Sequence, residues 1–177
     1  MIRIFDFVFS LIGLIILYPL LIFIFFIGLF DNGSPLFIQS RVGRNLKSFL
    51  LIKFRTMPMD TRSAGTHLIK NVKLSYFGYF LRKKKFDEIP QLWNVLVGDM
   101  SLVGPRPCLF NQKKLITVRK KRGVFKVKPG ITGLSQILGI NMKTPTLLAR
   151  TDQKMIKEMS LYNYFFYIFR TIFKIFR

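Results

Sequence analysis

Residues 7–30 read FVFSLIGLIILYPLLIFIFFIGLF and contain no charged side chain. As one α-helix, this stretch would be roughly 36 Å long, enough to cross the hydrocarbon core of a bilayer. Pro19 lies near its middle, and because proline lacks an N–H and its ring clashes with the carbonyl of Ile15, we expect a kink there. Each half is then about 18 Å long, which suits entry into one leaflet and return. The sequence predicts a proline-broken, re-entrant membrane helix, and a kinked helix that spans the bilayer stays open.

The chain is unusually basic for so apolar a sequence. It has 29 Lys plus Arg against 8 Asp plus Glu, a formal net charge of +21, and 50% hydrophobic residues. A membrane accounts for both the charge and the apolar content, because apolar side chains can enter lipid while cations face acidic head groups. A phospholipid membrane is therefore the expected partner. Nucleic acid is disfavoured as a partner, since the apolar N-terminus would bring the protein to a membrane first. Positive residues on both sides, Arg3 before and Arg41 and Arg44 after, favour two cytosolic ends.

The remaining chain reads mainly as helices with one β-hairpin. Strands are expected at 36–39 and 49–54 around a turn at 41–45. Helical spacing of apolar residues predicts an amphipathic helix over 68–81 and a basic helix over 110–122. Loops and turns are predicted at 57–66, 104–107 and 129–133.

The tail at 159–177 is aromatic and carries Arg170 and Lys174 at helical spacing, which is typical of an interfacial helix lying on a bilayer. We find no linker and no repeat. The predicted fold class is therefore α+β, mainly α with a small β-hairpin. It forms one membrane-associated domain, with a re-entrant helix at 1–31 and a cytosolic-face part at 32–177.

Asp87 and Glu88 stand side by side in a chain poor in acids, directly after the basic run RKKKF at 82–86. An Asp before a helix with Pro90 in its first turn is a good N-cap, and most such aspartates have no other role. A helix N-terminus also binds phosphate and keeps a carboxylate ionised, as a nucleophile requires. Such a carboxylate attacks phosphorus to give an aspartyl phosphate, and Mg²⁺ suits its oxygens. The buried face of this helix is predicted to consist of Ile89, Leu92, Trp93 and Leu96.

Four motifs carry a resemblance to a known family. They read KFRTM at 53–57, DEIPQLWNVL at 87–96, GDMSLVGPRP at 98–107 and KPGITGLSQ at 128–136. The chain resembles the bacterial sugar transferases, the monotopic polyprenyl-phosphate phosphoglycosyl transferases with a small catalytic domain. The likeness covers nearly the whole chain.

The resemblance implies transfer of a sugar-1-phosphate from a UDP-sugar to a polyprenyl (undecaprenyl) phosphate, giving a polyprenyl-diphosphate sugar and UMP. This would be the first membrane step of glycoconjugate synthesis, on the cytosolic face of the bacterial inner membrane. It implies Mg²⁺ as cofactor and a covalent phosphosugar on Asp87, which is also the expected metal contact, with Glu88 as its catalytic partner. Basic residues expected at the phosphates or nucleotide are Lys53, Arg55, Arg82 and Arg106.

The chain departs from the family pattern at one notable place. Many relatives have Asn-Gly-Arg where this chain has Leu138-Gly139-Ile140, so a common arginine is missing and selectivity or activity is altered on that reading. The alternative function is a catalytically inactive, membrane-anchored scaffold of a glycan-assembly complex, with Asp87 only a cap. A homodimer is compatible with the sequence. Cys108 is expected to be a small structural residue, and His67 a surface loop residue.

Overall fold

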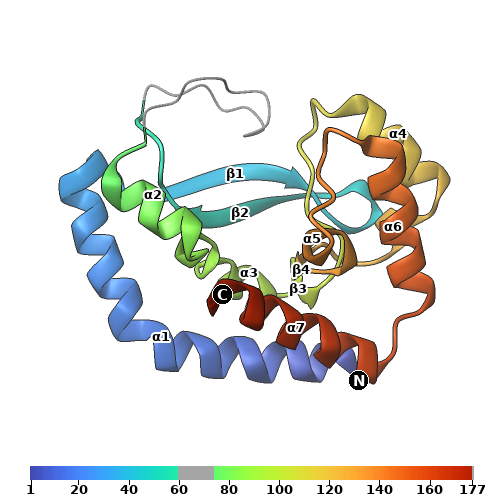
Figure 1. Ribbon diagram of the computed structural model, residues 1–177, viewed down its shortest axis with the longest axis horizontal. Coiled ribbons are helices and arrows are strands. Elements are labelled where there is room, and N and C mark those ends of the chain that lie inside the picture. Colours follow the sequence, from blue (N-terminus) through green and yellow to red (C-terminus); the bar gives the residue numbers. More distant parts are fainter. Residues whose placement is uncertain (60–73, 177) are drawn as a thin grey trace.

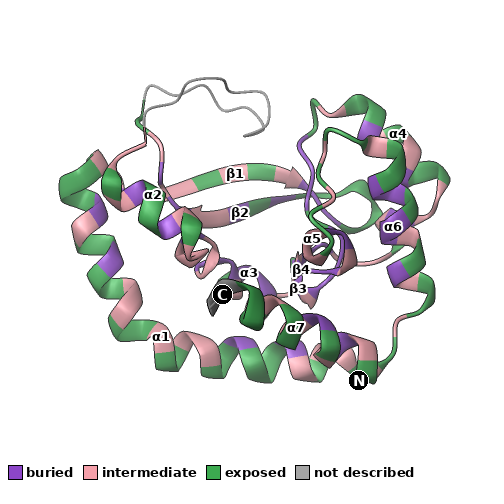
Figure 2. Cartoon of the chain, viewed as in Figure 1, coloured by how far each residue is buried: buried purple, intermediate pink, exposed green. Residues whose placement is uncertain are grey.

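One long helix, α1 (Ile2–Asn32), borders the molecule in the computed structural model, which describes residues 1–59 and 74–176. The helix contains Pro19 and bends about midway (Figure 1), so the predicted kink is present. Figure 2 shows it mostly exposed, with only Asp6, Ser10, Ile24 and Gly28 buried. By length and composition it can cross a membrane, and unlike the core helix of a soluble protein it leaves its apolar side chains uncovered.

The predicted hairpin is confirmed. Strands β1 (Leu36–Val42) and β2 (Ser48–Phe54) pair antiparallel, with Leu36 opposite Phe54 and Val42 opposite Ser48. Both strands are longer than expected at the turn end, because Val42 also bridges to Cys108 and extends the pairing. A short 3₁₀ helix, η1 (Arg44–Leu46), closes the hairpin.

Two short helices and a 3₁₀ turn follow the hairpin: α2 (Tyr76–Lys83), η2 (Phe86–Glu88) and α3 (Gln91–Val97). The prediction that Asp87 caps the next helix is wrong. Lys85 takes a left-handed conformation (φ 56°) that ends α2, and the chain enters η2 at once. Asp87 therefore lies inside a 3₁₀ turn, while α3 begins only at Gln91, after Pro90.

The predicted buried face of α3 is also wrong in part. Trp93 is 52% exposed, whereas Gln91, Asn94 and Val95 are buried. The reason is that α3 packs on the backbone of β2, where a polar side chain satisfies exposed peptide groups. The Asn94 amide donates to the carbonyl of Leu50 (2.7 Å) and accepts from the N–H of Ile52 (3.0 Å).

A second sheet joins β3 (Ser101–Val103) and β4 (Gly130–Thr132) in parallel. The prediction of a turn at 129–133 is therefore wrong. A Cβ on Gly130 would lie 2.0 Å from the backbone nitrogen of Gly104, so the two main chains cross where no side chain fits. Glycine is needed here because the two main chains approach closely, whereas in the sequence it indicated a turn.

Helices complete the chain: α4 (Lys113–Lys121), η3 (Val124–Lys126), α5 (Leu134–Ile137), α6 (Pro145–Lys157) and α7 (Leu161–Phe176). The predicted C-terminal helix is confirmed as a helix. It lies along the first half of α1 (Figure 1), where Phe165 contacts the rings of Phe5 and Phe9. Its outer side exposes large apolar groups, including Phe166, Phe169 and Phe173.

The fold class is confirmed as mainly α with two small sheets. Predictions at 60–73 lie outside the described residues: most of the loop at 57–66 with its Asp60, His67, and the first part of the helix at 68–81. Within the described part, that helix begins at Tyr76. Cys108 is buried in an apolar cluster, as expected.

Asp6, which the sequence analysis overlooked, ties α1 to the rest of the molecule. One oxygen of its buried carboxylate accepts hydrogen bonds from the Ser101 hydroxyl (3.0 Å), the Leu102 N–H (2.9 Å) and the Tyr164 hydroxyl (2.9 Å). The Arg3 guanidinium donates to the carbonyls of Val95 and Leu96 at the end of α3. The first turns of α1 are thus held by β3, α3 and α7 together.

Candidate active site

The two adjacent carboxylates on η2 occupy different environments. Asp87 is 7% exposed, and its carboxylate accepts no hydrogen bond from any residue that the structure describes. Glu88 pairs with Arg106 at 2.5 Å, with side chains 14% and 47% exposed respectively. Glu88 is therefore committed to an arginine, and Asp87 is the carboxylate left for an external partner.

Electrostatics separate the two acids further. Burial, and secondly the charge of Glu88, raise the pKa of Asp87 to about 6, while Lys53, Arg82 and Arg106 act in the opposite direction. Burial alone would raise the pKa of Glu88, but Arg106 overcomes this and holds it below its ordinary value. At neutral pH both carboxyl groups are ionised, and the protein stabilises the negative charge less well on Asp87 than on Glu88.

Three of the predicted cations gather around this pair. Burial lowers the pKa of Lys53, on β2, to about 8 despite the attraction of Asp87. Arg82, at the end of α2, donates to the Thr56 hydroxyl at 2.8 Å and acts electrostatically on Asp87. Helix α2 comes close to β2 because Gly78 packs on the carbonyl of Thr56, where a Cβ would lie at 2.6 Å.

Arg55 is placed apart from the other predicted cations. Its guanidinium donates to the carbonyls of Ser34 (3.0 Å) and Leu36 (3.3 Å), at the start of β1. It also lies over the ring of Phe37. In this structure Arg55 joins the hairpin to the end of α1, and its predicted contact with phosphate stays a prediction.

Arg41 belongs to the site and was not predicted there. Burial and the neighbouring Arg106 lower its pKa to about 10, and among the described residues its buried Nε has no hydrogen-bond partner. It lines a small cavity of about 30 Å³ together with Leu51, Lys53, Glu88, Gln91, Arg106, Pro107, Gly130 and Ile131. The hairpin register could have found it, since Arg41 pairs with Phe49 and shares the strand alternation of Leu51 and Lys53.

The site thus collects more positive than negative charge. Arg41, Lys53, Arg82 and Arg106 surround two carboxylates, and burial or mutual repulsion lowers the pKa of Arg41 and Lys53. Buried charges of one sign call for a counter-charge, so the arrangement favours an anionic ligand. The described residues contain no group of three or more metal-ligating side chains. The unpartnered Asp87 carboxylate nevertheless fits Mg²⁺, which binds through one or two carboxylates plus phosphate and water oxygens.

A buried ion pair supports the site from behind. Arg119 and Asp152, on α4 and α6, are 2% and 0% exposed and meet at 2.7 Å. The other Asp152 oxygen accepts from the Ser135 hydroxyl at 2.7 Å, and Arg119 also donates to the backbone carbonyl of Arg106 at 2.8 Å. This tie fixes the main chain that carries Arg106 toward Glu88.

An apolar cavity of about 430 Å³ lies between the bend of α1 and the site. Pro90 and Trp93 line it from the chain segment that follows the acid pair. Ile52 and Phe54 line it from β2, whose intervening Lys53 faces the small charged cavity. Its lining from α1 and the start of β1 consists of Leu14, Tyr18, Leu21, Ile22, Phe25, Phe26 and Leu36.

Comparison with known proteins places the chain in a family. The family described as "Bacterial sugar transferase" matches residues 1–177. A "UDP-galactose-lipid carrier transferase" of Erwinia amylovora is 32% identical over 96% of this chain and 39% of its own length. An "Undecaprenyl-phosphate galactose phosphotransferase" of Salmonella typhimurium is 34% identical over 96% of this chain and 39% of its length.

A "UDP-glucose:undecaprenyl-phosphate glucose-1-phosphate transferase" of Xanthomonas campestris pv. campestris is 38% identical over 86% of this chain and 32% of its length. The chain therefore spans about two fifths or less of the length of these three relatives. The match to the family, in contrast, runs from one end of the chain to the other. The chain belongs to the bacterial sugar transferase family.

Proposed function

We propose that this protein transfers a sugar-1-phosphate from a UDP-sugar to a polyprenyl phosphate, through a covalent phosphosugar on Asp87. The observation that carries the proposal is the unpartnered, nearly buried Asp87 carboxylate within an excess of cations. The names of the Salmonella and Xanthomonas relatives describe transfer to undecaprenyl phosphate. Their similarity to this chain supports the same acceptor class here.

The reaction divides into two displacements at one phosphorus. An oxygen of Asp87 attacks the β-phosphorus of the UDP-sugar, and the bond from that phosphorus to the oxygen bridging the α-phosphate breaks. UMP leaves with that oxygen, and the sugar phosphate stays on Asp87. An oxygen of the polyprenyl phosphate then attacks the same phosphorus, which frees the carboxylate and gives the polyprenyl-diphosphate sugar.

The surrounding residues have distinct roles in this scheme. Arg106, Arg41 and Lys53 offset the charge of the diphosphate and of the departing UMP. Glu88 holds Arg106 in place through their ion pair. Its negative charge also raises the pKa of Asp87, against the effect of the cations, and so keeps the Asp87 carboxylate more basic and a better nucleophile. Asp87 would also contact Mg²⁺, which when bound neutralises phosphate oxygens and aids departure of the leaving group.

The acceptor is expected to approach from the membrane side. The apolar cavity beside Pro90 and Trp93 gives a polyprenyl chain a dry surface next to the charged site. The bent, largely exposed α1 and the aromatic outer side of α7 support a re-entrant attachment to one leaflet. On this proposal the catalytic part, residues 32–177, faces the cytosol at the bacterial inner membrane.

The test is UMP release by detergent-purified protein with Mg²⁺ and a panel of UDP-sugars, first without acceptor and then with undecaprenyl phosphate. Without acceptor, we expect release of about one UMP per protein and a gain in protein mass equal to one sugar phosphate. With acceptor, release becomes catalytic. Asp87→Asn should abolish the mass gain and lower turnover by roughly 10⁴-fold or more.

Glu158→Gln is the matched control, because it makes the same chemical change at an exposed acid directly after α6 and should keep wild-type turnover. Turnover without any mass gain would leave the transferase proposal standing and remove the covalent step. Folded wild-type protein that releases no UMP from any donor would favour the membrane-anchored scaffold instead.

A further inference from the structure

A second positively charged cavity lies away from the acid pair. It measures about 300 Å³, and none of its lining residues lines the small cavity at Glu88 and Arg106. The first turns of α1, β3, η3 and the end of α6 enclose it. Its cationic side chains are Arg3, Arg44, Lys126 and Lys128.

These cations lack acidic partners within the described part of the chain. Arg3 Nη2 and Lys128 Nζ converge on Gly98, where an added Cβ would lie 3.1 Å and 3.3 Å from them. Neither makes an ion pair there, and Lys128 has no hydrogen-bond partner among the described residues. Burial, then the charge of Arg3, lowers the pKa of Lys128, while Asp6 and Asp99 act against this.

Asp6 does not serve as the missing counter-charge. One of its oxygens already accepts three hydrogen bonds from β3 and α7, and it forms no ion pair with the cavity cations. Asp99 is exposed and acts on Lys128 only at a distance. Four cations around one buried, engaged acid leave an excess of positive charge, which an anion would offset.

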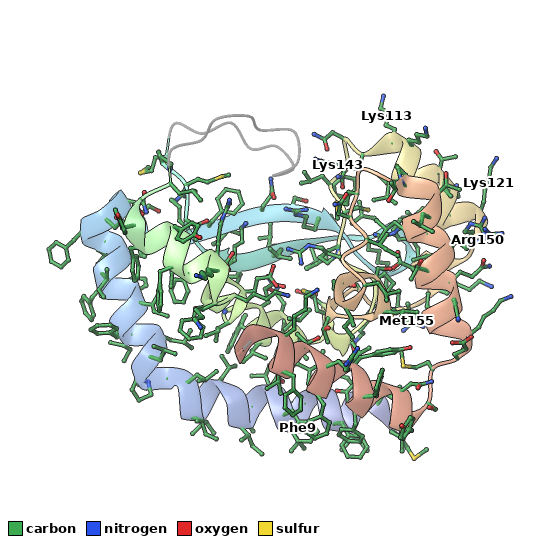
Figure 3. The ribbon with its side chains drawn as sticks, in the orientation of Figure 1. Phe9, Lys113, Lys121, Lys143, Arg150 and Met155 are labelled. Atoms are coloured by element: carbon green, nitrogen blue, oxygen red, sulfur yellow. The ribbon has the colours of Figure 1, made fainter. Side chains whose placement is uncertain are left out.

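Apart from Asp6 and Ser101, the rest of the lining is apolar, and this indicates an anion that also carries an apolar part. Ile2, Val103, Val127, Met155, Ile156 and Met159 form this part, and Met155 of α6 is labelled in Figure 3. The cavity also borders the exposed apolar surface of α1, where Met1 and Ile4 are 85% and 66% exposed. Phosphate groups of a bilayer lie at this kind of boundary between charged and apolar surface.

We propose that this cavity binds the headgroup phosphate of one anionic phospholipid, such as a phosphatidylglycerol, with its glycerol and upper acyl carbons against the apolar wall. Arg44 and Lys128 supply the charge. Arg3 is shared with α3, whose last carbonyls it also binds. A lipid held here anchors the first turn of α1 at headgroup depth.

The experiment uses the full chain, delipidated in neutral detergent, with native mass spectrometry to count bound lipid and a thermal melt as a second readout. Phosphatidylglycerol, phosphatidylcholine, inorganic phosphate and undecaprenyl phosphate are added in separate series. We expect one phosphatidylglycerol to bind about tenfold more tightly than phosphatidylcholine. Arg44→Gln/Lys128→Gln should weaken phosphatidylglycerol binding roughly tenfold or more, since each cation contributes near an anionic lipid.

Lys113→Gln/Lys121→Gln is the matched control, because it removes the same charge from exposed positions on α4 that point away from the molecule (Figure 3). It should bind phosphatidylglycerol within twofold of wild type. Equal weakening in both double variants would overturn the proposal, because binding would then follow net charge. Stabilisation by inorganic phosphate that equals that by phosphatidylglycerol and is lost in Arg44→Gln/Lys128→Gln would identify a free-phosphate site in this cavity. Displacement of the lipid by equimolar undecaprenyl phosphate would identify an acceptor site, and either outcome overturns the phospholipid assignment.

Discussion

Two carboxylate–arginine pairs lie on either side of the Arg106 main chain, and they differ in their physical state. Arg119–Asp152 is fully buried, and the Asp152 carboxylate accepts from Arg119 Nε (3.0 Å), Arg119 Nη2 (2.7 Å) and Ser135. In Glu88–Arg106 the arginine is 47% exposed and the glutamate 14%, and beside this pair the Asp87 carboxylate accepts no hydrogen bond from the described residues. One pair is closed and satisfied, and the other leaves charge available to a ligand.

The difference indicates that the buried pair supports the fold and that the open pair, with Asp87, is available for chemistry. A satisfied buried pair rigidifies the structure, while an unsatisfied cluster costs stability and persists where function requires it. The raised pKa of Asp87 and the lowered pKa of Lys53 and Arg41 mark the second kind. The two pairs should therefore respond in opposite ways to substitution.

Asp152→Asn should have the largest effect on stability. It leaves the Arg119 charge buried without a counter-ion, and we expect a loss of about 3–5 kcal/mol in the free energy of unfolding. Thermal or denaturant unfolding in detergent measures it. Loss of turnover at temperatures where the variant is still folded would instead assign Asp152 a part in the chemistry.

Arg106→Gln should lower turnover by about 10²–10³-fold, because it removes a cation from the phosphate site. Its effect on unfolding should be smaller than that of Asp152→Asn, since the Arg106 side chain is 47% exposed whereas Arg119 and Asp152 are both buried. Arg150→Gln, at an exposed position on α6 labelled in Figure 3, is the control and should leave both quantities unchanged. A stability loss as large as that of Asp152→Asn would remove the contrast between the two pairs.

Asp87→Asn should stabilise the metal-free protein, in contrast to Asp152→Asn. The pKa of Asp87 is raised from 3.8 to about 6 in the folded state, so the folded protein holds this proton more tightly. The free energy of unfolding of the wild type should fall as pH rises from about 4 to 6, by up to about 3 kcal/mol, and then level off.

The variant should lack that slope, so its advantage in the free energy of unfolding grows from about pH 4 and is complete above about pH 6. Melts across this pH range in EDTA measure it. Adding Mg²⁺ should stabilise the wild type and not the variant, which tests Asp87 as a metal contact without any activity assay. Equal Mg²⁺ stabilisation of both proteins would place the metal elsewhere.

Lys53→Arg should have the smallest effect, on pH dependence. Burial lowers the pKa of Lys53 to about 8, so its positive charge is present below that pH and is lost above it. For the wild type, kcat/KM should be roughly tenfold lower at pH 9 than on its plateau. The arginine variant should keep its own plateau through pH 9, because a guanidinium stays protonated. An unchanged alkaline limb would assign it to another group.

Local patterns in the sequence predicted the elements that depend on local forces. The uncharged run at 7–30, its central Pro19 and the alternation at 49–54 each correspond to an observed element. The acid pair and Arg106 were found through motifs and do lie together. Asp87 as an N-cap was wrong, because a left-handed Lys85 redirects the chain and no propensity rule anticipates that conformation in lysine.

Contacts between distant segments were beyond such patterns. Strand β4 exists because Gly130 and Gly104 pass almost in contact, and a glycine followed by Ile-Thr-Gly reads locally as a turn. Arg41 joins the site because β1 extends to Val42, into the predicted turn at 41–45. Trp93 is exposed because its helix packs through Asn94, and it lines the apolar cavity beside α1.

The Asp6 carboxylate also has a consequence for how the protein is made. Tyr164 lies 158 residues further along the chain, so at about 5–20 residues per second the ribosome needs roughly 10–30 s to supply this last donor. Ser101 and Leu102 are made earlier, so the full set of three donors to the Asp6 carboxylate exists only at the end of that interval. On the proposed membrane attachment, water would solvate this charge until the donors are made, while the apolar run behind it could already enter lipid. The last hydrogen bond that fixes the start of α1 can therefore form only when the C-terminal helix has been made.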